Sequence, residues 1–364
     1  MQTDVLVVGG GLSGLSLAHH LAQTGTDFLL VEAQDRLGGR ILTQETGGAA
    51  FDLGPAWFWP GQLRMAQLVR RLGLEVFEQY STGAIVFQDP LGHVQRDRGY
   101  SSMMGSLRVA GGMGALISGL QSGLAPSRLR LKTKVTSIED TGNSICAKLE
   151  SDAGVQTVTT RHVVLAVPPR IIADTITFTP ELPQIAMRSM TQIPTWMAAQ
   201  AKIVAIYDHP HWRNAGLSGD ATSQKGPMVE LHDASPAYGG PYALFGFVGY
   251  PAAMRAEHPD EILDLARQQL VAMFGPEMAN PIFLHMQDWA LNPAIATAAD
   301  QVSPRSHPNY GLPSLLSNLW SGTLTLASTE VAQAFGGYME GALEAAEAAG
   351  RRVQIRKAAS IRRL

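Results

Sequence analysis

A strand, a glycine-rich turn, a helix and a second strand occupy the first forty residues, and this order constrains the fold more than any other feature of the sequence. The apolar residues 5–8 lead into Gly9, Gly11 and Gly14, spaced as G-x-G-x-x-G, and an Ala- and Leu-rich helix follows. A second apolar run ends at the acidic Glu32. This context on both sides of the glycines predicts a Rossmann-like α/β unit that binds a dinucleotide.

Each glycine of the turn has a physical role. Gly9 permits a sharp turn, the missing side chain of Gly11 lets a pyrophosphate approach the backbone, and Gly14 lets the helix pack against the strand. The helix begins at Leu12 and Ser13. Its N-terminus presents unpaired N–H groups and the positive end of the helix dipole to the phosphates.

The acidic end of the second strand narrows the choice of cofactor. Glu32, followed by Ala33, stands where a carboxylate accepts both hydroxyls of a ribose. Its charge would repel a 2′-phosphate, so NADP is disfavoured. Taken alone, the first forty residues fit both flavin enzymes and nicotinamide enzymes.

Length and composition exclude several classes of protein. The 364 residues suggest about two domains. The net charge of −3 gives the protein no overall bias toward nucleic acid. No apolar run reaches the roughly 18 residues of a transmembrane helix. Met1 leads within three residues into the first strand, so we expect no signal peptide and a cytoplasmic location.

The sequence shows no spacing of ligand residues that is typical of a metal site. Its single cysteine, Cys146, excludes an internal disulfide and any multi-cysteine metal site. The histidines His209, His211 and His232 are followed by no second ligand pair at a zinc-like spacing. We therefore interpret these histidines as residues of surface loops and expect no metal ion.

Nucleotide-binding elements are expected at both ends of the chain. The apolar run 163–167 is typical of a buried parallel strand, and a last helix is expected from about Gly337 to Ala349. Between them, residues 200–207 have the pattern of a strand and residues 260–274 that of an amphipathic helix. We predict an α/β fold in which a discontinuous nucleotide-binding domain carries an inserted α+β substrate domain.

The domain boundaries follow from these elements. The nucleotide-binding domain is predicted to comprise residues 1–80, 107–178 and 308–350, and the substrate domain residues 81–106 and 179–307. Residues 351–364 hold six basic residues and no acidic one, and we interpret them as a solvated, partly disordered tail. Such a tail could contact a membrane surface, an acidic partner or the acidic body of the protein.

Five further motifs narrow the family. They are Gly38-Gly39-Arg40, Asp52-Leu-Gly54, Pro168-Pro169, Lys202 in an apolar strand, and Phe335-Gly-Gly-Tyr338-Met339. In this order and spacing they resemble the flavin-containing monoamine oxidase family, and its short bacterial members most, to about residue 350. The resemblance implies FAD as the cofactor and an FAD-binding Rossmann-like domain.

The resemblance also implies roles for single residues. It implies that Arg40 binds the pyrophosphate, that the backbone of Val135 meets the adenine, and that Glu330 lies near the ribityl chain. Met339 matches a backbone contact to the flavin at a helix start, where the dipole stabilises a reduced ring. The expected cofactor-binding residues are Gly9, Gly11, Leu12, Ser13, Gly14, Glu32, Ala33, Gly39, Arg40, Gly54, Pro55, Ala56, Trp57, Val135, Pro168, Glu330 and Met339.

Lys202, Tyr338 and Trp57 are expected to take part in the chemistry. In the family the lysine bonds a water that reaches flavin N5 and is linked to oxygen reactivity. The tyrosine forms one wall of an aromatic cage that orients the amine, and Trp57 belongs to the segment beside the isoalloxazine ring. From the residues alone, Lys202 could instead be a snorkelling lysine on a strand face, and Tyr338 a core tyrosine.

Three positions depart from the family pattern. Counted without a gap from Trp289, Ala298 stands where covalent members carry the cysteine that attaches FAD, so non-covalent FAD is expected. Ala299 then stands where the family has the second tyrosine of the cage. That wall of the cage is missing here unless Trp57 or another aromatic residue replaces it. Ser328 replaces a glycine that is usual near the cofactor, which costs backbone freedom.

The expected reaction is the oxidation of an amine to an imine by hydride transfer to flavin N5, with oxygen as acceptor and hydrogen peroxide as product. The expected partners are a small-molecule amine and oxygen, and a homodimer is allowed. Three alternatives stay open: a flavin desaturase or isomerase of an isoprenoid or porphyrin-like substrate, an L-amino acid oxidase, and a binding protein whose active site has decayed. The amino acid oxidase is disfavoured because residues 52–57 contain no arginine for a carboxylate, and Arg64 lies in the following helix.

Overall fold

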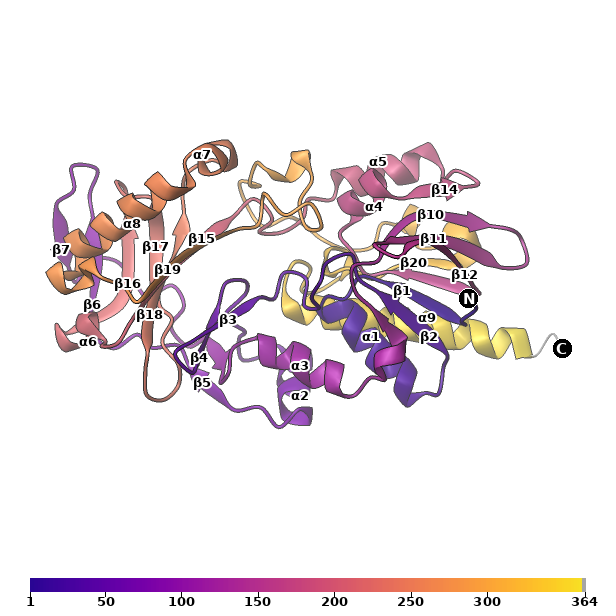
Figure 1. Ribbon diagram of the computed structural model, residues 1–364, viewed down its shortest axis with the longest axis horizontal. Coiled ribbons are helices and arrows are strands. Elements are labelled where there is room, and N and C mark those ends of the chain that lie inside the picture. Colours follow the sequence, from indigo (N-terminus) through magenta and orange to yellow (C-terminus); the bar gives the residue numbers. More distant parts are fainter. Residues whose placement is uncertain (362–364) are drawn as a thin grey trace.

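Two large β-sheets lie toward opposite ends of the molecule, with helices packed around them (Figure 1). The computed structural model describes residues 1–361, and their side chains as far as residue 356. The chain reaches the far sheet twice, over residues 84–96 and over residues 201–288, and returns to the first sheet each time. The first and last helices consequently pack against each other, although they are more than 300 residues apart in sequence.

The first sheet is parallel throughout, with the strand order β20-β13-β1-β2-β9. Its strands are β1 (Val5–Val8), β2 (Phe28–Val31), β9 (Leu129–Arg130), β13 (His162–Leu165) and β20 (Leu324–Leu326). All residues of β1 and β2 are buried, because both faces of the sheet are covered. This confirms the parallel α/β fold expected from the sequence.

Helices cover one face of the parallel sheet and a smaller sheet covers the other. Val5 and Val7 face the helices α1 (Leu12–Gln23), α3 (Gly114–Ser122) and α9 (Met339–Ile361). Leu6 and Val8 face the four-stranded sheet β12-β11-β10-β14. Its strands are β10 (Lys134–Asp140), β11 (Ile145–Ser151), β12 (Gly154–Thr160) and β14 (Thr177–Thr179).

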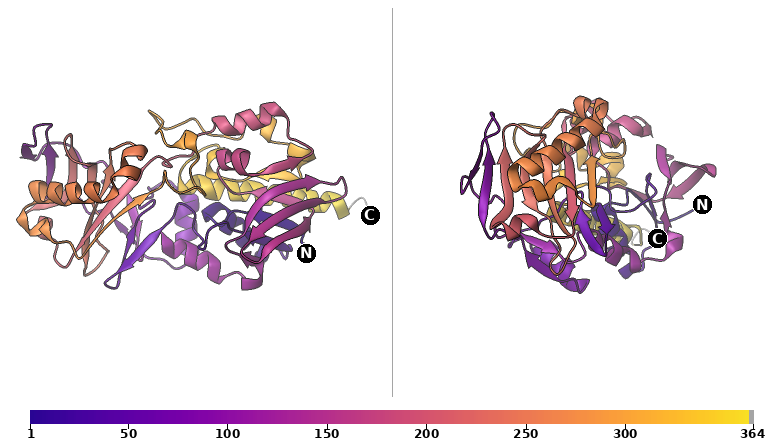
Figure 2. Two further views of the ribbon diagram at one scale, coloured as in Figure 1. Left: turned by 45° about the horizontal axis from the view of Figure 1, so that its top comes forward. Right: turned by 60° about the vertical axis from the view of Figure 1, so that its left-hand side comes forward.

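The far sheet has the order β19-β15-β18-β17-β16-β6-β7, and its pairs are antiparallel except β16 with β6. Its strands are β6 (Ala84–Gln88), β7 (Val94–Arg96), β15 (Ala201–Tyr207), β16 (Leu217–Ser223), β17 (Met228–Asp233), β18 (Tyr242–Val248) and β19 (Phe283–Asp288). Helix α8 (Pro259–Phe274) packs on the face of Ile203 (Figure 2). Val204 and Ile206 face the other way, toward Phe51.

Shorter elements connect the sheets. The remaining strands are β3 (Thr43–Thr46), β4 (Ala49–Asp52), β5 (Val76–Glu78) and β8 (Leu107–Val109). The remaining α-helices are α2 (Leu63–Arg71), α4 (Pro169–Thr175), α5 (Gln184–Gln192), α6 (His211–Asn214) and α7 (Ala252–Glu257). Short 3₁₀ helices span Pro126–Arg128, Pro276–Ala279, Ala298–Asp300, Ser314–Leu316, Leu319–Gly322 and Thr329–Val331.

The last helix is longer than its sequence pattern suggests. The expected end at Ala349 is wrong, because α9 continues through the basic segment to Ile361. Gly350 does not stop the helix, and its lack of a side chain lets α9 approach the ring of His20 on α1. Val353 is buried in the core one turn further on. The part of the predicted tail at 362–364 lies outside the described residues.

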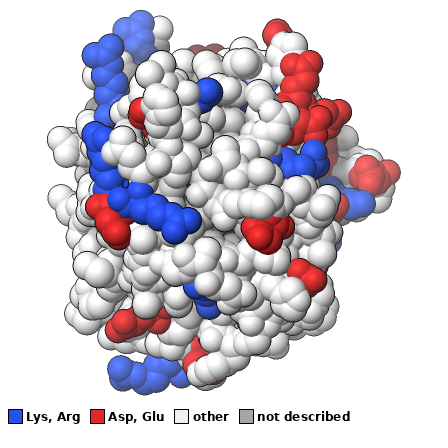
Figure 3. Space-filling model, turned by 90° about the vertical axis from the view of Figure 1, so that its left-hand side faces the viewer, with Lys and Arg blue, Asp and Glu red and all other residues white. Residues whose placement is uncertain are grey.

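The surface at the end of the molecule formed by the far sheet is not dominated by charges of one sign. Acidic and basic side chains are scattered over it among large uncharged areas (Figure 3). Within residues 1–361, no helix is long and apolar enough to cross a membrane.

Candidate active site

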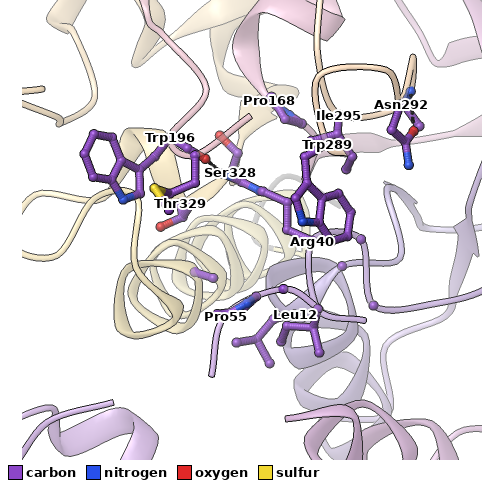
Figure 4. A pocket seen from close by; sticks show the side chains of 18 of the residues that line it. Leu12, Arg40, Pro55, Pro168, Trp196, Trp289, Asn292, Ile295, Ser328 and Thr329 are labelled. Atoms are coloured by element: carbon purple, nitrogen blue, oxygen red, sulfur yellow. Dashed lines mark hydrogen bonds between the residues drawn. The ribbon is translucent and has the colours of Figure 1, made fainter. Parts of the chain in front are cut away.

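A cavity of about 1090 Å³ runs from the glycine-rich turn of the first sheet to the face of the far sheet. Gly11 and Glu32 line one end, and Lys202, Phe247 and Glu230 line the other. The parts of the wall thus come from segments far apart in the sequence, as the labelled side chains of Figure 4 show.

All residues named above for cofactor binding or chemistry line this cavity except Gly14 and Glu330. Gly14 packs instead: a Cβ there would lie 1.9 Å from the carbonyl oxygen of Gly9. Glu330 is fully buried behind Arg40.

The glycine-rich turn fits a bound pyrophosphate. Gly9 has a φ of +104°, which only glycine adopts readily. Apart from its chain neighbours, the nearest atom to where a Cβ on Gly11 would be is the carbonyl oxygen of Gly38 at 3.9 Å, so a Cβ there would meet no close contact. No side chain caps the N-terminus of α1 next to it, so the first N–H groups of the helix are available to an anion.

Glu32 is fixed at the end of β2 by the backbone. Its Oε2 accepts a hydrogen bond from the N–H of Gly10 at 2.6 Å, and its Oε1 accepts one from the N–H of Gln34 at 2.8 Å. Each carboxylate oxygen retains a lone pair. The carboxylate is therefore oriented before any ribose binds.

Arg40 lines the cavity and forms an ion pair with Glu330 behind it. The Nη1 and Nη2 atoms of Arg40 donate to the two carboxylate oxygens at 2.6 and 3.3 Å. Nη1 also donates to the carbonyl of Trp196 at 3.3 Å. Glu330 thus holds the guanidinium against the cavity wall, where it can meet a phosphate.

Ser328 lies at the cavity wall and has a buried hydroxyl without a described partner. A bound cofactor with polar atoms would satisfy that hydroxyl. Its φ of −78° and ψ of 162° are ordinary extended values, so the expected cost of serine in place of glycine is absent.

Lys202 is buried among carbonyls and aromatic rings. Its Nζ donates to the carbonyl of Gly54 at 2.6 Å and to that of Asp52 at 3.3 Å. Burial lowers the pKa of Lys202 to about 7; the Asp52 carboxylate opposes this shift and Arg108 adds to it. The side chain does not snorkel to solvent, and it exchanges a proton near neutral pH.

Tyr338 lies in a cluster of aromatic rings. His307 stacks on it at 5.2 Å between ring centres, and Trp59 meets it nearly at right angles at 6.2 Å. Ala298 and Ala299, counted into the cysteine and second cage positions, do not line the cavity. Instead they lie in a short 3₁₀ helix.

Trp57 lies beside Lys202 and not beside Tyr338. Its ring packs against the edge of His232 at 5.1 Å and against Phe245 at 5.2 Å. Its indole N–H donates to Gln79 at 2.8 Å. Trp59, two residues later, is the tryptophan that faces Tyr338, and sequence reasoning missed it.

His232 is not a surface-loop residue, which corrects the expectation from sequence. It is buried in β17, with Nδ1 2.8 Å from Asp220 and Nε2 3.0 Å from Glu230. Glu230 lines the cavity and was also missed. The alternation of Glu230 and His232 in a short strand is the signal that could have indicated it. Among the side chains that the structure describes, as far as residue 356, no group of three or more His, Cys, Asp or Glu residues could hold a metal ion.

Comparison with known proteins identifies the family. The profile of the flavin containing amine oxidoreductase family matches residues 12–95 and 89–354, nearly the whole chain. The chain belongs to this family. As the family description implies, this amine oxidoreductase uses a flavin.

Several curated relatives are similar over most of their length. A probable flavin-containing monoamine oxidase A of Dictyostelium discoideum is 22% identical, covering 94% of this chain and 95% of the relative. The flavin-containing amine oxidase B of Sus scrofa is 23% identical, covering 97% and 86%. A putative flavin-containing monoamine oxidase of Mycobacterium tuberculosis is 24% identical, covering 96% of each.

Solved structures share the fold of this amine oxidoreductase. A putrescine oxidase bound to putrescine superposes with a TM-score of 0.80 at 20% identity, covering 98% of this chain and 99% of the other. A cyclohexylamine oxidase from Brevibacterium oxydans gives 0.79 at 20% identity, covering 97% and 99%. These likenesses confirm the amine oxidase fold.

Proposed function

We propose that the protein is an FAD-dependent oxidase that converts an amine to an imine and passes the electrons to oxygen, giving hydrogen peroxide. The observation that carries this proposal is the burial of Lys202 at the end of a cavity that begins at a dinucleotide-binding turn. When bound, FAD supplies the acceptor for a hydride from the carbon next to the amine nitrogen and the reaction with oxygen.

The residues of the cavity support non-covalent FAD. The glycine-rich turn, Glu32, Arg40 and Ser328 offer groups for phosphate, ribose and hydroxyl contacts along one wall. Cys146, the chain's one cysteine, lies in β11 near Thr159 and does not line the cavity. We therefore expect acid precipitation to release all of the FAD.

Lys202 and Tyr338 have separate roles in the proposal. With a pKa of about 7, Lys202 can hold or give up a proton at Nζ, through a water, while oxygen is reduced. Tyr338 and Trp59 offer ring faces to orient the amine. The reacting nitrogen must be neutral, because its lone pair takes part in forming the imine.

The cavity disfavours an α-amino acid as substrate. Arg40 is the only arginine among the described residues that line the cavity, and its guanidinium is paired with Glu330. Arg64 pairs with Glu340 and Glu347 outside the cavity. Among the described residues that line the cavity, no free guanidinium is placed to bind a substrate carboxylate.

Oxygen consumption tests the proposal. Protein reconstituted with FAD should consume oxygen in the presence of a primary or secondary amine and release peroxide in equal amount. Amine-dependent flavin reduction without peroxide would show a different acceptor. Turnover of a polyene or porphyrinogen instead of any amine would favour a desaturase.

A cytoplasmic location and a homodimer stay predictions.

A further inference from the structure

A row of four side chains crosses the far sheet along the cavity wall. Gln287 pairs with Lys202, Lys202 with Phe247, and Phe247 with Glu230, on the adjacent strands β19, β15, β18 and β17. Directly paired residues of antiparallel strands project to the same face, and all four line the cavity. Since neighbouring strands lie about 4.8 Å apart, the Cα atoms of Lys202 and Glu230 are about 10 Å apart.

Among the described residues, hydrogen bonds reach only one of the two carboxylate oxygens of Glu230. Its Oε1 accepts hydrogen bonds from Ser102 at 2.6 Å and from His232 at 3.0 Å. Its Oε2 accepts none from the described residues. The hydrogen bond from His232 keeps the pKa of Glu230 below its usual range, against the effect of burial, so the carboxylate is charged at neutral pH.

The charge of Glu230 is not neutralised by its neighbours. His232 is shared between Glu230 and the buried Asp220, so one positive charge at most serves two carboxylates. The other two described carboxylates that line the cavity are engaged: Asp288 by both Nε and Nη2 of Arg255, and Glu32 by backbone N–H groups. The cluster of Glu230, His232 and Asp220 therefore carries an excess negative charge, and the apolar ring of Phe247 separates it from Lys202.

We propose that Glu230 binds a second, cationic nitrogen of the substrate, so that the protein prefers a straight-chain diamine or a longer polyamine to a monoamine. This inference rests on the proposed oxidation of an amine near Lys202. The nitrogen to be oxidised enters neutral at the Lys202 end, the methylene chain crosses Phe247, and the distal ammonium pairs with Glu230. Only the reacting nitrogen has to lose its proton.

Matched amines test the inference on the FAD-loaded protein. Straight-chain diamines are compared with primary monoamines of the same carbon number, and the readout is the ratio of their kcat/KM values. We expect the wild-type protein to favour a diamine by about tenfold or more, and Glu230→Gln to reduce that ratio by about tenfold. Glu230→Asp should restore part of the preference, and the control Ser102→Ala should keep it, because both retain the charge.

A binding measurement separates this inference from the proposed function. Amines whose nitrogen-bearing carbons carry no hydrogen cannot form an imine, so their binding is measured by calorimetry without turnover. The diamine analogue should bind about tenfold more tightly than the monoamine analogue, and Glu230→Gln should abolish that difference. If no amine reduces the flavin but this difference holds, the proposed oxidation fails and the cation site stands. If amines are oxidised but neither ratio depends on Glu230, the cation site is overturned and the oxidation stands.

Discussion

The Nζ atom of Lys202 lies 4.1 Å from the centre of the Phe245 ring, on the cavity side of the far sheet. A ring face stabilises an ammonium, but less than the water it replaces. The two carbonyls that Nζ contacts add partial negative charge. The balance leaves a buried lysine that titrates near neutral pH, and this property underlies the first two predictions.

Lys202 should make stability depend on pH. Its pKa is about 7 in the folded protein and 10.5 when exposed, so between these values the unfolded chain binds the extra proton. Stability therefore rises with pH across this window, by at most about 1.4 kcal/mol per pH unit from this group. Lys202→Met should remove that slope in urea unfolding of the flavin-free protein. The exposed Lys148, changed to Met, is the control. An unchanged slope in Lys202→Met would show that Lys202 titrates normally.

Lys202→Met should also separate the two halves of the reaction. We expect the rate of flavin reoxidation by oxygen to fall by about 100-fold, since a positioned proton donor is lost. Anaerobic reduction by the amine should fall far less. Stopped-flow absorbance of the flavin measures both. Equal losses in the two steps would assign Lys202 to substrate positioning.

Removing only one partner of the Arg40–Glu330 ion pair should lower the free energy of unfolding. Arg40→Met leaves the fully buried Glu330 without a counter-charge and should destabilise the flavin-free protein by about 3–5 kcal/mol. The double variant Arg40→Met/Glu330→Gln should regain much of that loss, because the buried charge is gone. Urea unfolding of the four proteins of this cycle gives the coupling. A double variant no more stable than Arg40→Met would contradict the pairing.

Ser328→Ala should weaken FAD binding without harming the fold. The Ser328 hydroxyl has no described partner, so the flavin-free protein should lose little stability. A hydrogen bond to the cofactor contributes about 1 kcal/mol, so the Kd for FAD should rise about fivefold. Flavin fluorescence quenching measures the Kd, and urea unfolding is the control. A stability loss with an unchanged Kd would place the hydroxyl in the protein's own hydrogen-bond network.

The sequence allowed the parallel sheet and much of the cavity to be predicted. Local pattern suffices for the strand that ends at Glu32 and for the apolar strand that carries Lys202, because burial on both faces leaves a continuous apolar run. Glycine spacing and a strand-to-helix context give the phosphate-binding turn. In such segments the residue types alone determine the local structure.

Other parts depend on contacts that no local pattern reveals. The strand β16 contains Ser218 and Asp220, which look like loop residues but are buried against partners from other strands. His232 looked exposed for the same reason. The helix α9 passes Gly350 because α1 offers a surface on which a glycine packs closely. The proposed role of Glu230 depends on the strand register that places it two strands from Lys202, and the sequence does not reveal this register.

Anaerobic reduction of the bound flavin tests the central claim most directly. The FAD-loaded protein is mixed with a panel of monoamines, diamines and secondary amines without oxygen, at several pH values, and the absorbance of oxidised flavin is followed. We predict that at least one amine bleaches the flavin, and that it does so faster as pH rises toward the pKa of that amine. A flavin that dithionite reduces but that no amine bleaches at any pH would contradict the assignment of amine oxidation.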